Sequence, residues 1–254
     1  MTRTILITGA TAGFGAATAK TFAHHGWKLV LTGRRQHRLE SLCHELGNDR
    51  AWPLCADIRD RQAMEDGINA LPHHFQDISV LVNNAGLALG IDPAQSCHLD
   101  DWQTVIDTNI NGLLVTTRLL LPRLIAFGPN ATIINIGSIA GSYSYPGSNV
   151  YGASKAFVRQ FSLNLRTDLH GTGVRVSCLE PGIAESEFSN VRFRGDHERA
   201  DSVYANTTPL TPEDIAETIY WIVSQPSHVN INTLEVMPTA QSPGAPLPIH
   251  TEED

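Results

Sequence analysis

Short apolar segments alternate along this chain with longer amphipathic segments, and that alternation restricts the possible folds more than any other feature. Several of the short segments, such as TILIT, TIINI and VRVSCL, are almost entirely apolar, as parallel strands are when helices cover both faces of their sheet. We expect strands at residues 4–8, 28–32, 51–56, 80–83, 132–137, 174–179 and 233–237. We expect helices at residues 13–25, 35–46, 60–71, 101–124, 149–170 and 212–224.

Strands that alternate with helices of this length are joined by right-handed crossovers and form a doubly wound sheet. The sequence therefore predicts an α/β fold of the Rossmann type, a seven-stranded parallel sheet with helices on both faces. No linker interrupts the alternation, so we expect a single domain over residues 1–238. Residues 239–254 lose the periodicity, and we expect a tail that is extended or packs on a neighbouring subunit.

The formal net charge of −8 argues against a protein that binds nucleic acid by neutralising phosphates. The first residues, MTRTILITGA, lack a basic segment followed by a long apolar stretch, and no uninterrupted apolar run approaches the ~18 residues of a membrane span. We therefore expect a cytoplasmic protein with no membrane or nucleic-acid partner. The four cysteines are scattered and no H-E-x-x-H motif occurs, so we expect reduced thiols and no metal.

A glycine-rich turn follows the first strand and opens the first helix. Glycines let the backbone approach a pyrophosphate, and the start of a helix offers free N–H groups and the positive end of its dipole. The T-G-x-x-x-G-x-G spacing differs from the standard dinucleotide motif, and glycines at a helix start can serve packing alone. The position after the first strand favours phosphate binding, and we expect cofactor contacts from Thr8, Gly9, Thr11, Ala12, Gly13, Phe14 and Gly15.

The end of the second strand distinguishes between the two nicotinamide cofactors. NAD enzymes place a carboxylate there to bind the ribose 2′-hydroxyl. This chain has Gly33-Arg34-Arg35 instead. Arg34 can stack near the adenine and bind a 2′-phosphate, assisted by Arg35. The alternative is a pair of solvated arginines at a helix start, where cations oppose the dipole. The sequence therefore predicts NADP(H) as the cofactor.

Two further strand ends fit a dinucleotide. Asp57 follows the third strand, where its carboxylate could bind the adenine amino group while Ile58 covers the ring. Asn84 belongs to the NNAG sequence after the fourth strand, where a glycine-containing turn could lie close to the nicotinamide ribose. Asn and Gly are also ordinary turn residues.

Ser138, Tyr151 and Lys155 form the predicted catalytic group. Tyr151 and Lys155 are four residues apart in a predicted helix and so share a face. A tyrosine titrates near ~10, but an adjacent ammonium and an oxidised nicotinamide both favour the phenolate. Ser138, at the end of the fifth strand, can bind the substrate oxygen. A lone Y-x-x-x-K pair is common on helix surfaces; the upstream serine and the glycine-rich turn favour catalysis.

Taken together, TGATAGFG, NNAG, the Ser138 strand end, YGASK and Pro181-Gly182 resemble the short-chain dehydrogenase/reductase family over essentially the whole chain. The resemblance implies a catalytic tetrad of Asn109, Ser138, Tyr151 and Lys155, in which Asn109 anchors a water that links the lysine to solvent. It implies a homotetramer as the usual assembly. It also implies that cofactor contacts near the nicotinamide include Tyr151 and Lys155, together with Pro181, Gly182, Ile183 and Ser186.

A narrower resemblance rests on NNAGLALG, VYGASKAFVRQFSLNLRTDLHGTGVRV, EFSNVRF and HVNINTLEVMP. These segments are similar to the NADP-dependent 3-hydroxy acid dehydrogenases, which oxidise serine, L-allo-threonine and short 3-hydroxy acids and reduce malonic semialdehyde. They are almost as similar to the NADPH-dependent sulfoacetaldehyde reductases, which form isethionate. The loop at residues 183–188 is shorter and less glycine-rich than in the serine-oxidising group, so both substrates stay open.

An anionic substrate requires a cation. Arg192 and Arg194 lie in the segment that covers the substrate in this family, and either could bind a carboxylate or sulfonate. If the segment is extended, the two side chains point in different directions; we favour Arg192, with Ser138 and Tyr151 as the other substrate contacts. Other functions remain as alternatives: a non-catalytic NADP-binding regulator, which should have a damaged tetrad, or a reductase of sugars, steroids or carrier-bound thioesters.

Overall fold

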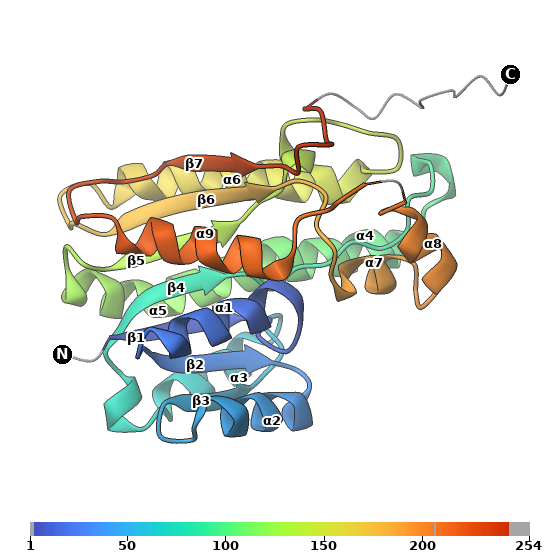
Figure 1. Cartoon of the computed structure of the whole chain (residues 1–254). Coiled ribbons are helices and arrows are strands. Elements are labelled where there is room, and N and C mark those ends of the chain that lie inside the picture. Colours follow the sequence, from blue (N-terminus) through green and yellow to red (C-terminus); the bar gives the residue numbers. More distant parts are fainter. Residues whose placement is uncertain (1–2, 206, 244–254) are drawn as a thin grey trace, which may run out of the picture.

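The computed structural model describes residues 3–205 and 207–243. The described residues form one parallel sheet of seven strands in the order β3-β2-β1-β4-β5-β6-β7, with helices on both faces (Figure 1). The strands are β1 (Thr4–Thr8), β2 (Lys28–Gly33), β3 (Ala51–Cys55), β4 (Ile78–Asn83), β5 (Thr132–Ile136), β6 (Arg175–Pro181) and β7 (Thr233–Val236). This architecture confirms the predicted fold.

The helices form two layers because successive strand residues point to opposite faces of the sheet. Ile5 and Ile7 pack with one layer, and Leu6 between them packs with the other. The first layer contains α1 (Gly13–His24), α2 (Gln36–Leu46) and α9 (Pro212–Ser224). The second contains α3 (Arg61–Asn69), α5 (Leu113–Phe127) and α6 (Asn149–Asp168).

The helix predicted at residues 101–124 is longer than expected and irregular. It consists of α4 (Leu99–Ile106), a π-helical turn (Asp107–Gly112) and α5. The turn lies where Gly112 meets Ile58: a Cβ at Gly112 would be 2.5 Å from Ile58 Cδ1. Single π-helical turns of this kind occur often at functional sites. Among the described residues, this helical segment is the one that by length and composition alone could cross a membrane; a third of its most apolar window is buried.

The segment after β6, which we expected to be a loop, contains two short helices. They are α7 (Glu187–Arg192) and α8 (His197–Ser202), and they lie beyond the carboxyl ends of the strands (Figure 1). Each begins at a side-chain cap: Ser186 accepts a hydrogen bond from Phe188 N, and Asp196 accepts one from Arg199 N. Serine and aspartate at these positions are the sequence signal for the two helix starts.

The domain boundary at residue 238 stays a prediction, as does the role of the tail. The first tail residues fold back on their own chain, because Gln241 Oε1 accepts a hydrogen bond of 2.8 Å from Ile183 N. The rest of the predicted tail, residues 244–254, lies outside the described residues.

Candidate active site

The glycine-rich turn lies where the strand order of the sheet reverses, with β2 on one side of β1 and β4 on the other. The turn and the loop after β4 are in close contact: a Cβ at Gly9 would be 2.9 Å from Ala85 Cα, and one at Gly15 would be 2.7 Å from Asn84 Nδ2. Thr8 Oγ1 accepts from the backbone N–H groups of Asn84 and Ala85, both at 2.9 Å. Asn84 Nδ2 donates back to Thr8 O. The side chains of Thr8 and Asn84 thus join the two loops.

The start of α1 forms a cradle that fits a pyrophosphate. Ala12 is the N-cap, and among the described residues no side chain caps the free N–H groups of the first turn. That turn carries no acidic residue, so its dipole is not neutralised locally. Gly13 has a φ of +50°, and a Cβ there would be 3.3 Å from Ser186 Cβ. Phe14 packs partly against the core. The residues present therefore fit a dinucleotide.

Cationic and acidic side chains gather at the ends of β2 and β3, which we call the adenosine end (Arg34, Arg35 and Asp57). Arg34 Nη1 lies 3.8 Å from Asp57 Oδ2, and its side chain is 63% exposed. Arg35 donates from Nε and Nη2 to Thr11 Oγ1, at 3.1 and 2.8 Å. Asp57 is also held by Arg59, which sequence analysis missed: Arg59 Nη2 donates to Asp57 Oδ2 at 2.6 Å.

Two details at this end concern Asp57 and Ile58, whose contacts with the adenine stay predictions. Partial burial pushes the pKa of Asp57 upward, but hydrogen bonds from Arg59 outweigh it and hold the pKa below its usual value. The carboxylate is therefore charged and already paired. Ile58 is buried and packs on Gly112, so its side chain belongs to the core as well as to the expected adenine site.

Ser138, Tyr151 and Lys155, which we call the chemical end, are brought together as predicted from their spacing. Ser138 follows β5 and caps a short 3₁₀ turn (Ile139–Gly141) by accepting from Ala140 N at 3.1 Å. Tyr151 and Lys155 extend from α6, and Tyr151 is hydrogen bonded to Ser138. Lys155 Nζ lies 5.9 Å from the Tyr151 ring centroid and donates to Ile136 O at 2.8 Å.

Burial dominates the protonation of both groups. It raises the pKa of Tyr151 to about 12, although the hydrogen bond with Ser138 and the charge of Arg192 act in the opposite direction. Burial lowers the pKa of Lys155 to about 8. At neutral pH the free protein therefore holds a phenol beside an ammonium that is close to losing its proton. Any further positive charge at this site lowers the pKa of the tyrosine.

Asn109 lies in the π-helical turn and is 2% exposed. Its Oδ1 accepts from Leu87 N at 2.8 Å, and its Nδ2 donates to Leu87 O and to Ser154 Oγ. A Cβ at Gly86 would be 3.2 Å from Asn109 Oδ1 and 3.5 Å from Lys155 Nζ, so the two predicted tetrad members meet across this glycine. The water-anchoring role of Asn109 stays a prediction.

The loop after β6 connects the sheet to α7. Pro181 ends β6, and Gly182 N donates to Val236 O at 2.7 Å. Ile183 N is bonded to Gln241, a contact that sequence analysis missed. Ser186 lies against Gly13 of the glycine-rich turn. These residues are close to the cradle, and their contacts with the nicotinamide stay predictions.

The two candidate substrate arginines have different surroundings. Arg192 is the last residue of α7, and Arg194 lies in the turn after the helix with a φ of +55°, so the segment is not extended and the two side chains diverge. Arg192 donates from Nε to Gly90 O at 3.1 Å and from Nη2 to Tyr145 Oη at 3.0 Å. Its guanidinium carbon lies 5.7 Å from the Tyr151 ring centroid. Arg194 points away and pairs with Asp101 at the surface. The geometry therefore favours Arg192.

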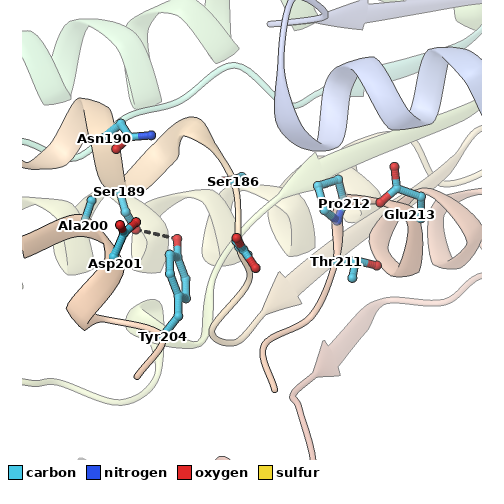
Figure 2. Close-up of a pocket in the computed structure, with 10 residues that line it drawn as sticks. Ser186, Ser189, Asn190, Ala200, Asp201, Tyr204, Thr211, Pro212 and Glu213 are labelled. Atoms are coloured by element: carbon cyan, nitrogen blue, oxygen red, sulfur yellow. Dashed lines mark hydrogen bonds between the residues drawn. The ribbon is translucent and has the colours of Figure 1, made fainter. Parts of the chain in front are cut away.

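A cavity of about 380 Å³ lies beside α7 and α8, but it is not the chemical end. Figure 2 shows Ser189 of α7 hydrogen bonded to Tyr204, at 2.6 Å between their hydroxyl oxygens. Ser186 is the one predicted site residue among the described residues that line this cavity. Among the described residues, no group of three or more His, Cys, Asp or Glu side chains is placed to hold a metal ion.

The sequence profile of the family described as short chain dehydrogenase matches residues 3–196. The chain belongs to this family. It is 55% identical to the NADP-dependent 3-hydroxy acid dehydrogenase YdfG of Salmonella typhi over 94% of this chain and 96% of that protein. It is 55% identical to a serine 3-dehydrogenase of Agrobacterium fabrum, over 95% and 96%. It is 54% identical to sulfoacetaldehyde reductase 2 of Chromohalobacter salexigens, again over 95% and 96%.

Solved structures agree with these relatives. The closed form of a serine dehydrogenase complexed with NADP⁺ superposes with a TM-score of 0.91 at 54% identity, covering 94% of this chain and 96% of that one. A serine dehydrogenase from Escherichia coli gives a TM-score of 0.82 at 50% identity, covering 94% and 99%. The resemblance and the dehydrogenase class inferred from the sequence are confirmed.

Within this short-chain dehydrogenase, residues outside the predicted cofactor and substrate contacts connect α7 to the rest of the site. Phe188 lies with its ring centroid 5.5 Å from that of Tyr151. Tyr145 and Gly90 hold Arg192. Glu187 pairs with Arg35. The helix cap at Ser186 was the available signal, because it predicts that Glu187, Phe188 and Arg192 share one helix.

Proposed function

We propose that this chain is an NADP(H)-dependent oxidoreductase that interconverts a short hydroxy acid and its aldehyde or semialdehyde, of the 3-hydroxy acid, serine or malonic semialdehyde type. The observation that carries the proposal is the position of Arg192. Its guanidinium is fixed by two hydrogen bonds beside Tyr151, and its Nη1 has no hydrogen-bond partner among the described residues. A fixed cation with free donors next to the proton-transfer residue suits a small anionic substrate.

NADP(H) is the cofactor that fits the adenosine end. The end of β2 carries Arg34 and Arg35 and no carboxylate, which suits a 2′-phosphate. The relatives named above include NADP-dependent enzymes. The glycine-rich turn from Thr8 to Gly15 would hold the pyrophosphate, and the loop from Pro181 to Ser186 would lie at the nicotinamide. When bound, the nicotinamide supplies or accepts the hydride.

The chemistry of the residues follows from their placement. In the reduction, the Tyr151 hydroxyl donates its proton to the carbonyl oxygen of the substrate, which the Ser138 hydroxyl holds by a hydrogen bond. In the oxidation, the Tyr151 phenolate accepts the alcohol proton. Lys155 places its charge beside that phenolate, and Asn109 fixes the helix at the point where it meets Gly86 and Lys155. This arrangement supplies orientation and charge, which are the usual contributions of protein to hydride transfer.

A second candidate is reduction of sulfoacetaldehyde to isethionate. A sulfonate can occupy the same guanidinium, and a curated relative at 54% identity has this activity by name. A non-catalytic regulator is disfavoured because the four tetrad residues are all present and assembled. Neutral sugars or steroids would leave Arg192 without a counter-charge.

We expect a cytoplasmic homotetramer. The helical segment Leu99–Phe127 presents apolar residues on a surface that the chain itself covers only in part. Ile125 of α5 is 42% exposed and Trp221 of α9 is 49% exposed, which suits surfaces buried by neighbouring copies. Light scattering coupled to size-exclusion chromatography measures the assembly directly, and a monomer would contradict the expectation.

A substrate panel tests the proposal. NADPH oxidation is followed with malonic semialdehyde, sulfoacetaldehyde and propanal, and NADP⁺ reduction is followed with L-serine. We expect kcat/KM for one of the two anionic aldehydes to exceed that for propanal by at least about tenfold, the value of one charge-assisted contact. Equal kcat/KM values for the anionic and neutral aldehydes would contradict the anionic substrate class. The ratio of the two anionic aldehydes decides between carboxylate and sulfonate.

A further inference from the structure

Glu187, the first residue of α7, joins two parts of the molecule that are far apart in sequence. Its Oε2 accepts from Arg35 Nη1 at 3.0 Å, and its Oε1 accepts from Arg38 Nη1 at 2.7 Å. Each carboxylate oxygen therefore has its own arginine, one at the N-cap of α2 and one in its first turn. Partial burial pushes the pKa of Glu187 upward, but hydrogen bonds from Arg38 and Arg35 outweigh it and keep the pKa low, so the bridge is charged on both sides.

The bridge continues into the cofactor cradle. Arg35 also donates from Nε and Nη2 to Thr11 in the glycine-rich turn. Ser186, the neighbour of Glu187, lies against Gly13 of the same turn. The start of α7 is thus fastened to α2 and to the pyrophosphate cradle at once, by one charged side chain and one close contact.

Another face of α7 reaches the chemical end. Phe188 and Arg192 are four residues apart and both lie close to the Tyr151 ring, at 5.5 and 5.7 Å from its centroid. A helix of six residues therefore connects the adenosine end with the proton-transfer residue. We expect a movement of its start to shift Phe188 and Arg192 relative to Tyr151.

The position of α7 depends on few contacts. Within this fully described helix, Ser189 is the one buried residue. The side of the helix that carries Ser189 and Asn190 borders the cavity of about 380 Å³ shown in Figure 2, where a single hydroxyl pair joins it to Tyr204. Because Ser189 is the one buried residue of α7, polar contacts at both ends of the helix hold it in place: the Glu187 bridge at its start, and the bonds of Arg192 to Gly90 and Tyr145 at its end.

We propose that Glu187 is a positioning residue: its bridge to Arg35 and Arg38 holds α7 over the cofactor cleft, and so places Phe188 and Arg192 at Tyr151. The proposal rests on the proposed function, in which Arg192 binds the substrate anion. Glu187 also places a negative charge beside Arg35, which is expected to assist in binding the 2′-phosphate. Its loss should therefore weaken substrate binding without weakening NADPH binding, a split that a general structural defect would not produce.

The Glu187→Gln variant tests this split. We expect the KM of the anionic substrate to rise about fivefold, the size expected for loss of two exposed ion pairs, with kcat changed less than twofold. The Kd of NADPH, measured by fluorescence titration without substrate, should be unchanged or lower. Glu185→Gln is the matched control, since it removes an exposed carboxylate two residues away and should leave KM and Kd as in the wild type. Weaker NADPH binding in Glu187→Gln, or an unchanged KM, would overturn the proposal.

Arg38→Gln removes the other half of one ion pair. Like Glu187→Gln, it should raise the substrate KM. Unlike Glu187→Gln, it should also raise the Kd of NADPH, because it removes a cation near the cofactor. In the double variant, KM should equal that of Glu187→Gln alone, since the same contact cannot be lost twice. If instead the double variant raised KM by the product of the two single effects, Glu187 and Arg38 would not act through a shared bridge.

Hydrogen exchange reports the position of α7 without cofactor or turnover. Amides in peptides that cover residues 187–193 should exchange several-fold faster in Glu187→Gln than in the wild type or Glu185→Gln, because the helix opens more often. Unchanged exchange would refute the bridge even if activity fell. Conversely, if anionic aldehydes are not substrates but exchange is faster in Glu187→Gln, the substrate assignment fails and the holding role of Glu187 stands.

Discussion

The adenosine end and the chemical end of the active site use charge in opposite environments. At the adenosine end, Arg34 and Arg35 have side chains that are 63% and 40% exposed, and each has a carboxylate within reach. At the chemical end, Lys155 is 6% exposed and its ammonium donates to a backbone carbonyl. Water and salt screen exposed charges strongly and buried charges much less. Single side chains should therefore matter far more at the chemical end.

The pKa shifts also differ between the exposed adenosine end and the buried chemical end. Hydrogen bonds to arginines prevail over burial at Asp57 and Glu187, whose pKa values lie below the usual range. Burial prevails at Tyr151 and Lys155, whose pKa values move to about 12 and about 8. The first environment fixes charges that are already present. The second disfavours the charged forms of Tyr151 and Lys155, so their protonation responds to the charges that a cofactor or substrate brings.

The largest expected effect is that of Tyr151→Phe. Removal of the hydroxyl removes the proton donor and acceptor, and we expect kcat to fall about 10³- to 10⁴-fold in both directions. The Kd of NADPH, measured by fluorescence, should stay within about twofold, because the adenosine end is untouched. Turnover within tenfold of the wild type would show that another group transfers the proton.

Arg192→Ala should have the next largest effect. Loss of a charge-assisted contact should lower kcat/KM for the anionic aldehyde about 10- to 100-fold, and that for propanal much less. Arg192 also lowers the pKa of Tyr151. Oxidation needs the phenolate, so its rate rises as pH passes the tyrosine pKa; without Arg192 that pKa is higher, and the rise should move to higher pH.

Two further variants separate charge from geometry at this position. Arg192→Lys keeps the positive charge but cannot reproduce both bonds to Gly90 and Tyr145, so the pH profile should return towards that of the wild type while kcat/KM stays low. Arg194→Ala is the control, since Arg194 pairs with Asp101 at the surface. An equal loss of kcat/KM in Arg192→Ala and Arg194→Ala would remove the assignment of Arg192.

The chemical end was predictable because its information is local. Tyr151 and Lys155 are one helical turn apart, and Ser138 follows a strand whose apolar character is evident in TIINI. The fold was predictable for the same reason: each strand and long helix carries its own periodicity. The irregular turn around Asn109 was not, because the contact between Gly112 and Ile58 joins separate segments of the chain.

The contacts around α7 lay beyond sequence reasoning. Arg35 and Glu187 are 152 residues apart, and Arg192 and Tyr145 are 47 apart. Arginine and glutamate are common on surfaces, so nothing in their sequence positions identifies them as a pair. The preference for Arg192 over Arg194 as the substrate contact stays a prediction. The sequence did not show that a helix ends at Arg192 and that Arg194 lies in the turn beyond it, with a φ of +55°.

Arg34→Ala probes the exposed end and should have a smaller effect. We expect kcat/KM with NADPH to fall about tenfold and that with NADH to change less than twofold, because a 2′-phosphate contact serves NADPH alone. Arg50→Ala removes an exposed arginine that pairs with Asp49 next to β3 and is the matched control. Equal losses of kcat/KM with NADPH and NADH would show that Arg34 does not bind the 2′-phosphate.

The smallest expected effect concerns a pair that combines both environments. The Glu180 side chain is 1% exposed, and Arg159, 43% exposed, lies 3.7 Å from it. Burial raises the pKa of Glu180, and the charge of Arg159 opposes that rise. A carboxyl whose pKa is raised on folding binds its proton more tightly in the folded state, so folding is favoured at low pH and stability is lost as pH rises through that pKa.

Arg159→Met should therefore lower stability by about 1 kcal/mol at pH 7.5, a modest value because the arginine is half exposed, and by less at pH 5. Thermal unfolding at equal protein concentration measures the difference at both pH values. In the Glu180→Gln background, Arg159→Met should lower the stability little, because that variant has no buried carboxylate that would lose its partner. The loss of stability could instead be equal at both pH values and in both backgrounds. Arg159 would then act through its contact with Ser142, and the buried charge of Glu180 would not contribute.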